Sequence, residues 1–209
     1  MKRILISGFE PFGDLKTNPT MELIERLNSK SIPNLEINTI ILPVVYNQCA
    51  AELIEYINEI KPDLVLSLGV AVGRSAITPE RIAINIQDTV GEGKSGDNHG
   101  DMPTDRPVER SGPDGLFSTL PIREMVQLLS NNGIPAQISN TAGTYICNNT
   151  MYSVLLHLKN NFPEMKAGFV HVPATPEMVL KKPSIPSMDI TVQERAMELI
   201  LEYLSQSEN

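Results

Sequence analysis

The sequence predicts an α/β protein, a three-layer α/β/α sandwich around a twisted, mainly parallel mixed sheet. Two observations carry this prediction. Segments typical of strands alternate with segments typical of helices, and the first three strand segments are rich in apolar residues, as in strands buried on both faces. The 209 residues are enough for one sizeable core, so we expect a single domain over residues 1–209.

The first part of the chain predicts the order strand, helix, strand, helix, strand. The first strand runs into a loop from Gly8 to Asn18, and Lys61-Pro62 ends the second helix because the residue before proline disfavours the helical conformation. The expected elements are strand Lys2–Ser7, helix Pro19–Leu27, strand Leu35–Pro43, helix Gln48–Ile60 and strand Asp63–Gly69.

The middle of the chain changes character. Residues Arg81–Asp88 alternate isoleucine with smaller or polar residues, a period of two that predicts a strand with unlike faces. From Thr89 to Gly115 no periodicity remains, and the segment is rich in Gly, Asp and Pro. A loop this long in a compact domain is usually functional, mobile or part of an interface.

The last part of the chain restores the alternation. It predicts helix Pro121–Ser130, strand Ala136–Asn140, helix Thr144–Lys159, strand Lys166–Val172 and a final amphipathic helix from about Val192 to Leu204. In such a fold the ligand crevice lies beyond the carboxyl ends of the strands.

Composition excludes several classes of function. A formal charge of −8 and a pI near 4.9 argue against a nucleic-acid partner and leave a neutral or small polar ligand. The first apolar run, Ile4-Leu5-Ile6, is too short for a signal peptide or a membrane span, so we expect a cytoplasmic protein with no membrane partner. The two cysteines and three histidines show neither metal-ligand nor disulfide spacing.

Cys147 is expected in the first turn of a helix that follows a strand. The free amides and the positive dipole end of a helix N-terminus favour a thiolate, the reactive form of cysteine. The competing interpretation is inert burial, because Cys147 shares the spacing of one apolar helix face with Met151, Val154, Leu155 and Leu158.

His171 near the end of a strand is a possible partner for this thiol. It shares a strand face with Ala167 and Phe169, and Pro173 ends the ladder, so we expect the imidazole to point out near the sheet edge. An imidazole can take the thiol proton and return it to a leaving amine, while a third group fixes the tautomer. A structural histidine is the alternative.

Two carboxylates are candidates for that third group. Glu80 stands at the mouth of the Arg81–Asp88 strand, and Asp88 at its far end is the weaker candidate. Acidic residues near strand ends are usually solvated or act as caps, so spacing alone does not decide between these roles.

Five motifs occur together and in order: GFEPFG (8–13), Asn18-Pro19, ITPERIAIN (77–85), SNTAGTYICN (139–148) and GFVHVP (168–173). With them the chain resembles the pyroglutamyl peptidase I family of cysteine peptidases, also called pyrrolidone carboxyl peptidases, from the first strand to the final helix. The resemblance implies a catalytic triad of Cys147, His171 and Glu80. It also implies removal of N-terminal pyroglutamyl residues from peptides, through a thioester and without a metal or organic cofactor.

The resemblance further implies a pocket for the small lactam. Phe9 and Phe12 would sandwich the ring, Asn18 would shape the loop, and Tyr145 and Ile146 would close the pocket. The two phenylalanines could instead anchor the loop in the core. A homo-oligomer, often a tetramer or otherwise a dimer, is also implied, with residues Thr89–Gly115 as a possible interface.

The chain departs from the family pattern at two places. After Asp88 it reads DTVGEGKSGDN instead of a shorter DARIPDN-like stretch, so no arginine occupies the position of the family's oxyanion donor, and Lys94 is the expected substitute. Val70 stands where the family commonly has glutamine. Two further hypotheses follow: a thiol amidase for another small lactam or acyl-amide, and a binding protein with weakened turnover.

Overall fold

The computed structural model describes residues 1–13 and 17–206. The expected loop from Gly8 to Asn18 therefore lies partly outside the described residues. The strands are β1 (Lys2–Phe9), β2 (Leu35–Leu42), β3 (Leu64–Val70), β4 (Thr78–Pro79), β5 (Ile82–Ile84), β6 (Gly115–Phe117) and β7 (Lys166–Val172). The helices are α1 (Pro19–Asn28), α2 (Gln48–Ile60), α3 (Ile122–Asn131), α4 (Ile146–Asn161) and α5 (Ile190–Gln206), with a 3₁₀ turn at Pro176–Val179.

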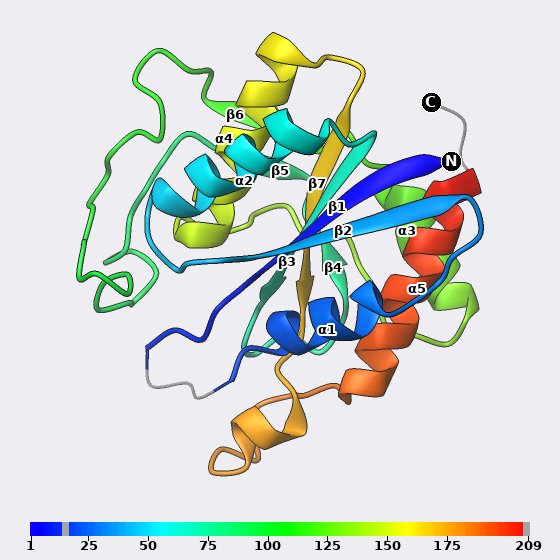
Figure 1. Ribbon diagram of the computed structural model, residues 1–209. Helices are drawn as coiled ribbons and strands as arrows, with labels where there is room; N and C mark the ends of the chain where they lie inside the picture. Colours follow the sequence, from blue (N-terminus) through cyan, green and yellow to red (C-terminus); the bar gives the residue numbers. More distant parts are fainter. Residues whose placement is uncertain (14–16, 207–209) are drawn as a thin grey trace.

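The main sheet has five strands in the order β2-β1-β3-β7-β4 (Figure 1). The pairs β1–β2, β1–β3 and β3–β7 are parallel, and only the two-residue strand β4 runs antiparallel, against β7. The predicted mainly parallel mixed sheet is confirmed. Because the three central strands all run the same way, their carboxyl ends meet at one edge of the sheet.

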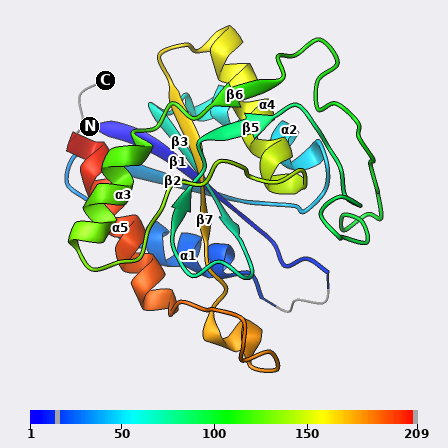
Figure 2. The ribbon, with the colours of Figure 1, turned by 180° about the vertical axis from the view of Figure 1, so that it is seen from behind.

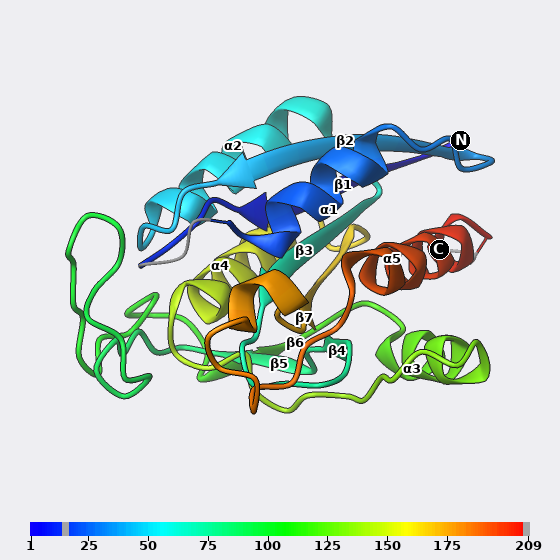
Figure 3. The same ribbon diagram turned by 90° about the horizontal axis from the view of Figure 1, so that it is seen from below.

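Helices cover both faces of this sheet, which confirms the expected three layers. Figure 3 shows α2 and α4 on one side and α1, α3 and α5 on the other. The alternation of side chains along β1 separates two cores, since Ile4 and Ile6 pack with α1, α3 and α5, whereas Leu5 packs with α2 and α4. The second face is the one on which the site is built.

The expected strand Arg81–Asp88 is wrong in its length and its place. Only Ile82–Ile84 is regular, and it pairs antiparallel with the unpredicted strand β6 in a separate two-stranded sheet beside α4 (Figure 2). The strand ends because its partner has only three residues, after which the Asn85 side chain binds the backbone of Glu109 and Gly112.

The expected strand Ala136–Asn140 is an extended segment and no regular strand. It forms two isolated parallel bridges, Ile77 with Ala136 and Glu80 with Ser139. Pro79 and Pro135 interrupt the ladder because proline has no amide hydrogen to donate. The segment nevertheless lies along the sheet edge and leads the chain toward Cys147.

Residues 89–114 contain no helix or strand, as predicted from their composition. In Figure 1 this segment forms the long green loop that projects from the body beside α4 and α2. Its first part returns to the sheet edge, where the amide of Asn98 donates to the Val44 carbonyl at 2.9 Å. It thereby reaches the carboxyl ends of the strands.

Candidate active site

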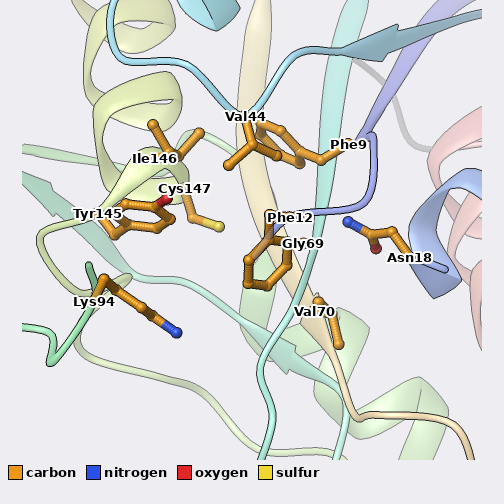
Figure 4. Close-up of a pocket in the computed structure, with 10 residues that line it drawn as sticks. All are labelled: Phe9, Phe12, Asn18, Val44, Gly69, Val70, Lys94, Tyr145, Ile146 and Cys147. Atoms are coloured by element: carbon orange, nitrogen blue, oxygen red, sulfur yellow. The ribbon is translucent and has the colours of Figure 1, made fainter. Parts of the chain in front are cut away.

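A small cavity of about 80 Å³ opens at the carboxyl ends of β1 and β3, beside the first turn of α4 (Figure 4). Its walls come from five separate segments of the chain. The lining residues are Phe9, Phe12, Asn18, Val44, Gly69, Val70, Lys94, Tyr145, Ile146 and Cys147. Apart from Asn18, Lys94 and the thiol, this wall is apolar or aromatic, and the cavity size suits a single small ring.

Cys147 is the second residue of α4, after the N-cap Tyr145. The expected first-turn position is confirmed, although the helix begins at Ile146 and not at Thr144. Met151, Val154, Leu155 and Leu158 of the same face are buried, yet the thiol itself is only partly buried and lines the cavity. The first amides of a helix have no carbonyl partner within it, so they are free to face a bound group.

Two buried asparagines fix the start of this helix. Asn148 accepts from the amide of Ile84 at 2.9 Å and donates to the carbonyls of Ile84 and Ile86. Asn149 accepts from the amide of Asn47 at 3.1 Å. Buried amide side chains with these partners hold α4 against β5 and α2, and hence set the position of the thiol.

Gly69 makes room for the thiol at the end of β3. A methyl group added to Gly69 would lie 2.7 Å from Cε1 of Phe169 and 3.0 Å from Sγ of Cys147. Gly69 is also the register partner of His171 on β7, and the rings of Phe169 and His171 have centroids 4.9 Å apart. The thiol, the phenyl ring and the imidazole therefore gather on one face of the sheet.

His171 and Glu80 form a buried pair behind the cavity. The imidazole Nδ1 lies 2.7 Å from Oε1 of Glu80, and the two side chains are 6% and 0% exposed. The expectation that the imidazole points out at the sheet edge is wrong, because β4 pairs with β7 at His171 and covers that edge. Asp88 takes no part in this pair; its carboxylate accepts from the amide of Gly91.

The Glu80 carboxylate has a second neighbour, the Arg74 guanidinium. Nη1 of Arg74 donates to the same Oε1 at 2.7 Å. Burial by itself would raise the pKa of Glu80, but hydrogen bonds and charge from His171, with smaller contributions from Ser139 and Arg74, outweigh it and lower the pKa. Glu80 is therefore a stable anion that holds one imidazole nitrogen.

The thiol shows the opposite behaviour. Burial, with a smaller contribution from the Glu80 charge, raises the pKa of Cys147 to about 12, while the Lys94 ammonium acts in the other direction. Burial thus acts against the helix N-terminus, which was expected to favour the thiolate. The resting thiol is neutral, and a base must take its proton before it can act as a nucleophile.

The first loop supplies one wall of the cavity. Phe9 is the last residue of β1 and is buried against Phe169, with ring centroids 6.2 Å apart, so it belongs to the sheet and not to the exposed loop. Asn18 is the N-cap of α1, accepting from Thr20 and donating to the Glu10 carbonyl. Its expected role in shaping the loop is consistent with these bonds.

Lys94 supplies the cationic part of the opposite wall. Its Nζ lies 5.6 Å from the ring centroid of Phe12 and 6.0 Å from that of Tyr145 (Figure 4). The described residues offer it no ion pair. Lys94 is therefore the charged side chain of this pocket.

Three hydrogen bonds dock the segment that carries Lys94. The Tyr145 hydroxyl donates to the Gly96 carbonyl at 2.8 Å, the Glu92 carboxylate accepts from the amide of Thr144 at 2.8 Å, and the Asn98 side chain donates to Glu10 at 2.8 Å. The segment is thus tied both to the start of α4 and to the loop after β1.

Neither a metal cluster nor a membrane span is apparent in the part of the chain that the structure describes. Residues 1–13 and 17–206 contain no group of three or more His, Cys, Asp or Glu side chains arranged to hold a metal ion. Within the same residues, no helix is long and apolar enough to cross a membrane.

Comparison with known proteins decides the relationship. The family model described as pyroglutamyl peptidase matches residues 2–207. The chain belongs to the pyroglutamyl peptidase family. The match spans the thiol, the His171–Glu80 pair and the docked loop.

Individual relatives agree with this assignment. The chain is 42% identical to the pyrrolidone-carboxylate peptidase of Levilactobacillus brevis, over 93% of each chain, and 42% identical to that of Halalkalibacterium halodurans, over 96% of this chain and 98% of the other. Its fold matches a crystal structure of pyroglutamyl peptidase I from Bacillus amyloliquefaciens with a TM-score of 0.93 and 33% identity, covering 100% of this chain and 99% of that one. The Thermococcus litoralis pyrrolidone carboxyl peptidase gives a TM-score of 0.92 at 40% identity, covering 100% and 97%.

In this pyroglutamyl peptidase fold, the residues expected from the sequence come together. Cys147 and all six expected pocket residues (Phe9, Phe12, Asn18, Val70, Tyr145 and Ile146) line one cavity. His171 and Glu80 lie behind it as a hydrogen-bonded pair and do not line it.

Several residues of the site were missed in the sequence. Gly69 and Val44 gave no periodic or motif signal, because their importance comes from neighbours far away in the chain. Arg74 lies only four and six positions before Thr78 and Glu80, but no motif pointed to these contacts. Asn148 and Asn149 carried a usable signal, since two adjacent amides inside an apolar helix face need buried partners.

Proposed function

We propose that this chain is a cysteine exopeptidase that removes N-terminal pyroglutamyl (5-oxoprolyl) residues from peptides. One observation carries the proposal. The neutral thiol of Cys147 opens into a small, largely apolar cavity, while the His171–Glu80 pair lies on the same face of the sheet. This arrangement provides a nucleophile, a base and a group that orients the base, with space for one small acyl group.

The chemistry follows from these roles. His171 takes the proton of Cys147 through Nε2, since Nδ1 faces Glu80, and the sulfur attacks the pyroglutamyl carbonyl carbon. When the carbon–nitrogen bond breaks, His171 returns the proton to the leaving amine and a thioester remains. A water molecule, deprotonated by His171, then attacks the thioester and releases pyroglutamate and the free thiol.

Two groups are proposed for the oxyanion. The backbone amide of Cys147 lies in the first turn of α4, where amides lack helical partners. The Lys94 ammonium, unpaired among the described residues, supplies positive charge to the same pocket. A preorganised donor of this kind typically contributes about two to three powers of ten in rate.

The lactam ring is proposed to lie against Phe9 and Phe12, with Tyr145 and Ile146 closing the cavity and Asn18 holding the loop. A flat, uncharged ring suits aromatic walls, because it loses little solvation on burial. The Val70 side chain is apolar, so only its backbone can form hydrogen bonds. We propose that the amide and carbonyl of Val70 meet the polar edge of the ring.

Hydrolysis of a chromogenic pyroglutamyl amide tests the proposal. The wild type is expected to release the amine, and Cys147→Ser is expected to lose nearly all activity. Cys49→Ser, which replaces the second thiol, 0% exposed, is expected to retain activity. No hydrolysis by the wild type, or equal rates in wild type and Cys147→Ser, would refute it. A panel with prolyl and acetyl amides separates a pyroglutamyl peptidase from an amidase for other small acyl groups.

Location and assembly belong to the same proposal. Two free cysteines fit a reducing compartment, and we propose a cytoplasmic enzyme that acts on peptides with an N-terminal pyroglutamate. A homo-oligomer, tetramer or dimer, is proposed from the family resemblance alone. Light scattering after gel filtration measures its mass, and a monomer at micromolar concentration would refute it.

A further inference from the structure

We propose that Arg74 is a positioning residue that sets the proton affinity of the Cys147–His171 system through Glu80. The inference rests on the proposed function for its chemistry. Its geometry stands by itself, because one carboxylate oxygen of Glu80 receives both the imidazole Nδ1 and the Arg74 Nη1, each at 2.7 Å.

A tight turn after β3 presents this arginine. The amide of Arg74 donates to the Ala71 carbonyl, and Gly73 has a φ of +98°, a conformation that favours glycine. The guanidinium then reaches three partners in two segments: the Thr78 hydroxyl at 2.7 Å, the nearby Glu80 carboxylate, and the Thr141 carbonyl at 3.2 Å. It therefore joins the acid of the pair to the segment that leads into the nucleophile.

The charge of Arg74 opposes protonation of the imidazole. A carboxylate alone beside His171 would strongly favour the imidazolium form. With a guanidinium on the same oxygen, part of that attraction is offset. Other titratable groups that act on the thiol are Cys49, Glu92 and Lys94, and none of them contacts the carboxylate of Glu80 among the described residues.

The sign of the effect does not depend on how the thiol and imidazole share their proton. Removal of a positive charge raises the pH at which any nearby group loses its proton. Without Arg74, the pH at which Cys147 becomes reactive must rise, whether the controlling step is loss of a proton by the imidazolium or by the thiol. A role confined to packing would lower stability and leave this pH unchanged.

The experiment measures Cys147 alkylation by iodoacetamide against pH, followed by mass spectrometry, in Arg74→Met, Arg74→Gln and Arg74→Lys. We expect the pH at which alkylation reaches half its maximal rate to rise by roughly half to one pH unit in Arg74→Met and Arg74→Gln. The rise should be much smaller in Arg74→Lys, which keeps the charge. Arg26→Gln is the matched control, since it also breaks an arginine–glutamate pair, with Glu194 at 2.8 Å, remote from the cavity.

Alkylation needs no peptide substrate, so this test is separate from that of the proposed function. Absence of pyroglutamyl amide hydrolysis in the wild type would refute the peptidase proposal and leave the Arg74 result readable. The inference is overturned if the pH of half-maximal alkylation stays unchanged in both Arg74→Met and Arg74→Gln, or if it shifts equally in Arg26→Gln. Should Arg74→Met fail to fold, the polar Arg74→Gln gives the same decision.

Discussion

The carboxylate of Glu80 holds the imidazole of His171 at 2.7 Å in a position where neither side chain is more than 6% exposed. Such a buried contact fixes the tautomer of the imidazole, because Nδ1 faces the carboxylate. Several measurable consequences follow from this relationship and from the cavity beside it.

Replacement of Glu80 by Gln keeps the size of the side chain and removes its charge. The imidazole then loses the group that fixes its tautomer, and the Arg74 guanidinium loses its anionic partner. We expect kcat for a pyroglutamyl amide to fall by about 10³–10⁴-fold, with little change in KM. Circular dichroism must show an intact fold, and a fall of less than tenfold would contradict the assigned role.

Replacement of Gly69 by Ala tests how the cavity floor holds the thiol. The new methyl group would meet Phe169 and the sulfur of Cys147 at 2.7 and 3.0 Å, so either the ring or the thiol must move. We expect a loss of about 1–3 kcal/mol in unfolding free energy, measured in urea. At least a hundredfold fall in kcat/KM should accompany it, because small displacements of a nucleophile are costly.

Gly168→Ala is the control for this change. Its methyl group would meet Oγ of Ser118 and Cδ1 of Leu120, both away from the cavity lining. It should lower the free energy of unfolding to a similar extent and leave kcat/KM almost intact. Equal activity losses in the two variants would show that the loss comes from general crowding of the sheet and not from displacement of the thiol.

Lys94→Met removes the charge of the pocket and keeps an unbranched side chain over Phe12 and Tyr145. If the ammonium stabilises the oxyanion, kcat should fall by about 10²–10³-fold, and Lys94→Arg should restore most of it. Steady-state kinetics on one pyroglutamyl amide provide the measurement. A change confined to KM would assign Lys94 to substrate binding and contradict the oxyanion role.

Cys49 predicts how stability depends on pH. Burial raises the pKa of this thiol to about 12, against about 8.5 in an unfolded chain. An acid with a raised folded pKa contributes stability that is complete below the unfolded pKa and is lost as the pH rises toward the folded one. At pH 10 the wild type should therefore lose roughly 2 kcal/mol through this group, relative to pH 7.

Urea unfolding at pH 7 and pH 10 measures that loss, with Cys49→Ala for comparison. The variant should be less stable at pH 7 because its thiol contact with Thr150 is gone, yet it should fall less steeply with pH. Parallel slopes for the two proteins would mean that Cys49 does not carry the alkaline transition.

The sequence predicted the layers because they rest on local patterns, whereas the triad of Cys147, His171 and Glu80 was implied by the family resemblance. Apolar runs identify β1, β3 and β7, and the strand ends then bring Cys147 and His171 to one edge of the sheet. Contacts between segments that are far apart in the chain could not be predicted from the sequence. The alternation of Arg81–Asp88 could not reveal that its partner strand has only three residues, nor that Asn85 binds the loop at Glu109.

The pKa of Cys147 could not be predicted from the sequence either. A helix N-terminus favours a thiolate, whereas the burial that raises the pKa of Cys147 comes from tertiary packing. Arg74 was also missed: Thr78 and Glu80 are only four and six positions away, but the contact with Thr141, 67 positions away, depends on the fold. Tertiary neighbours determine such charges, and no local pattern encodes them.

The docked segment around Lys94 has a practical meaning for protein engineering. It supplies a pocket wall through bonds to Glu10, Thr144 and Tyr145, and it contributes nothing to the bonds of Glu80 with His171 and Arg74. A combinatorial library confined to residues 90–96 would therefore vary one wall of the pocket, together with the charges of Glu92 and Lys94 that act on the thiol, while the bonds of Glu80 with His171 and Arg74 stay as inherited.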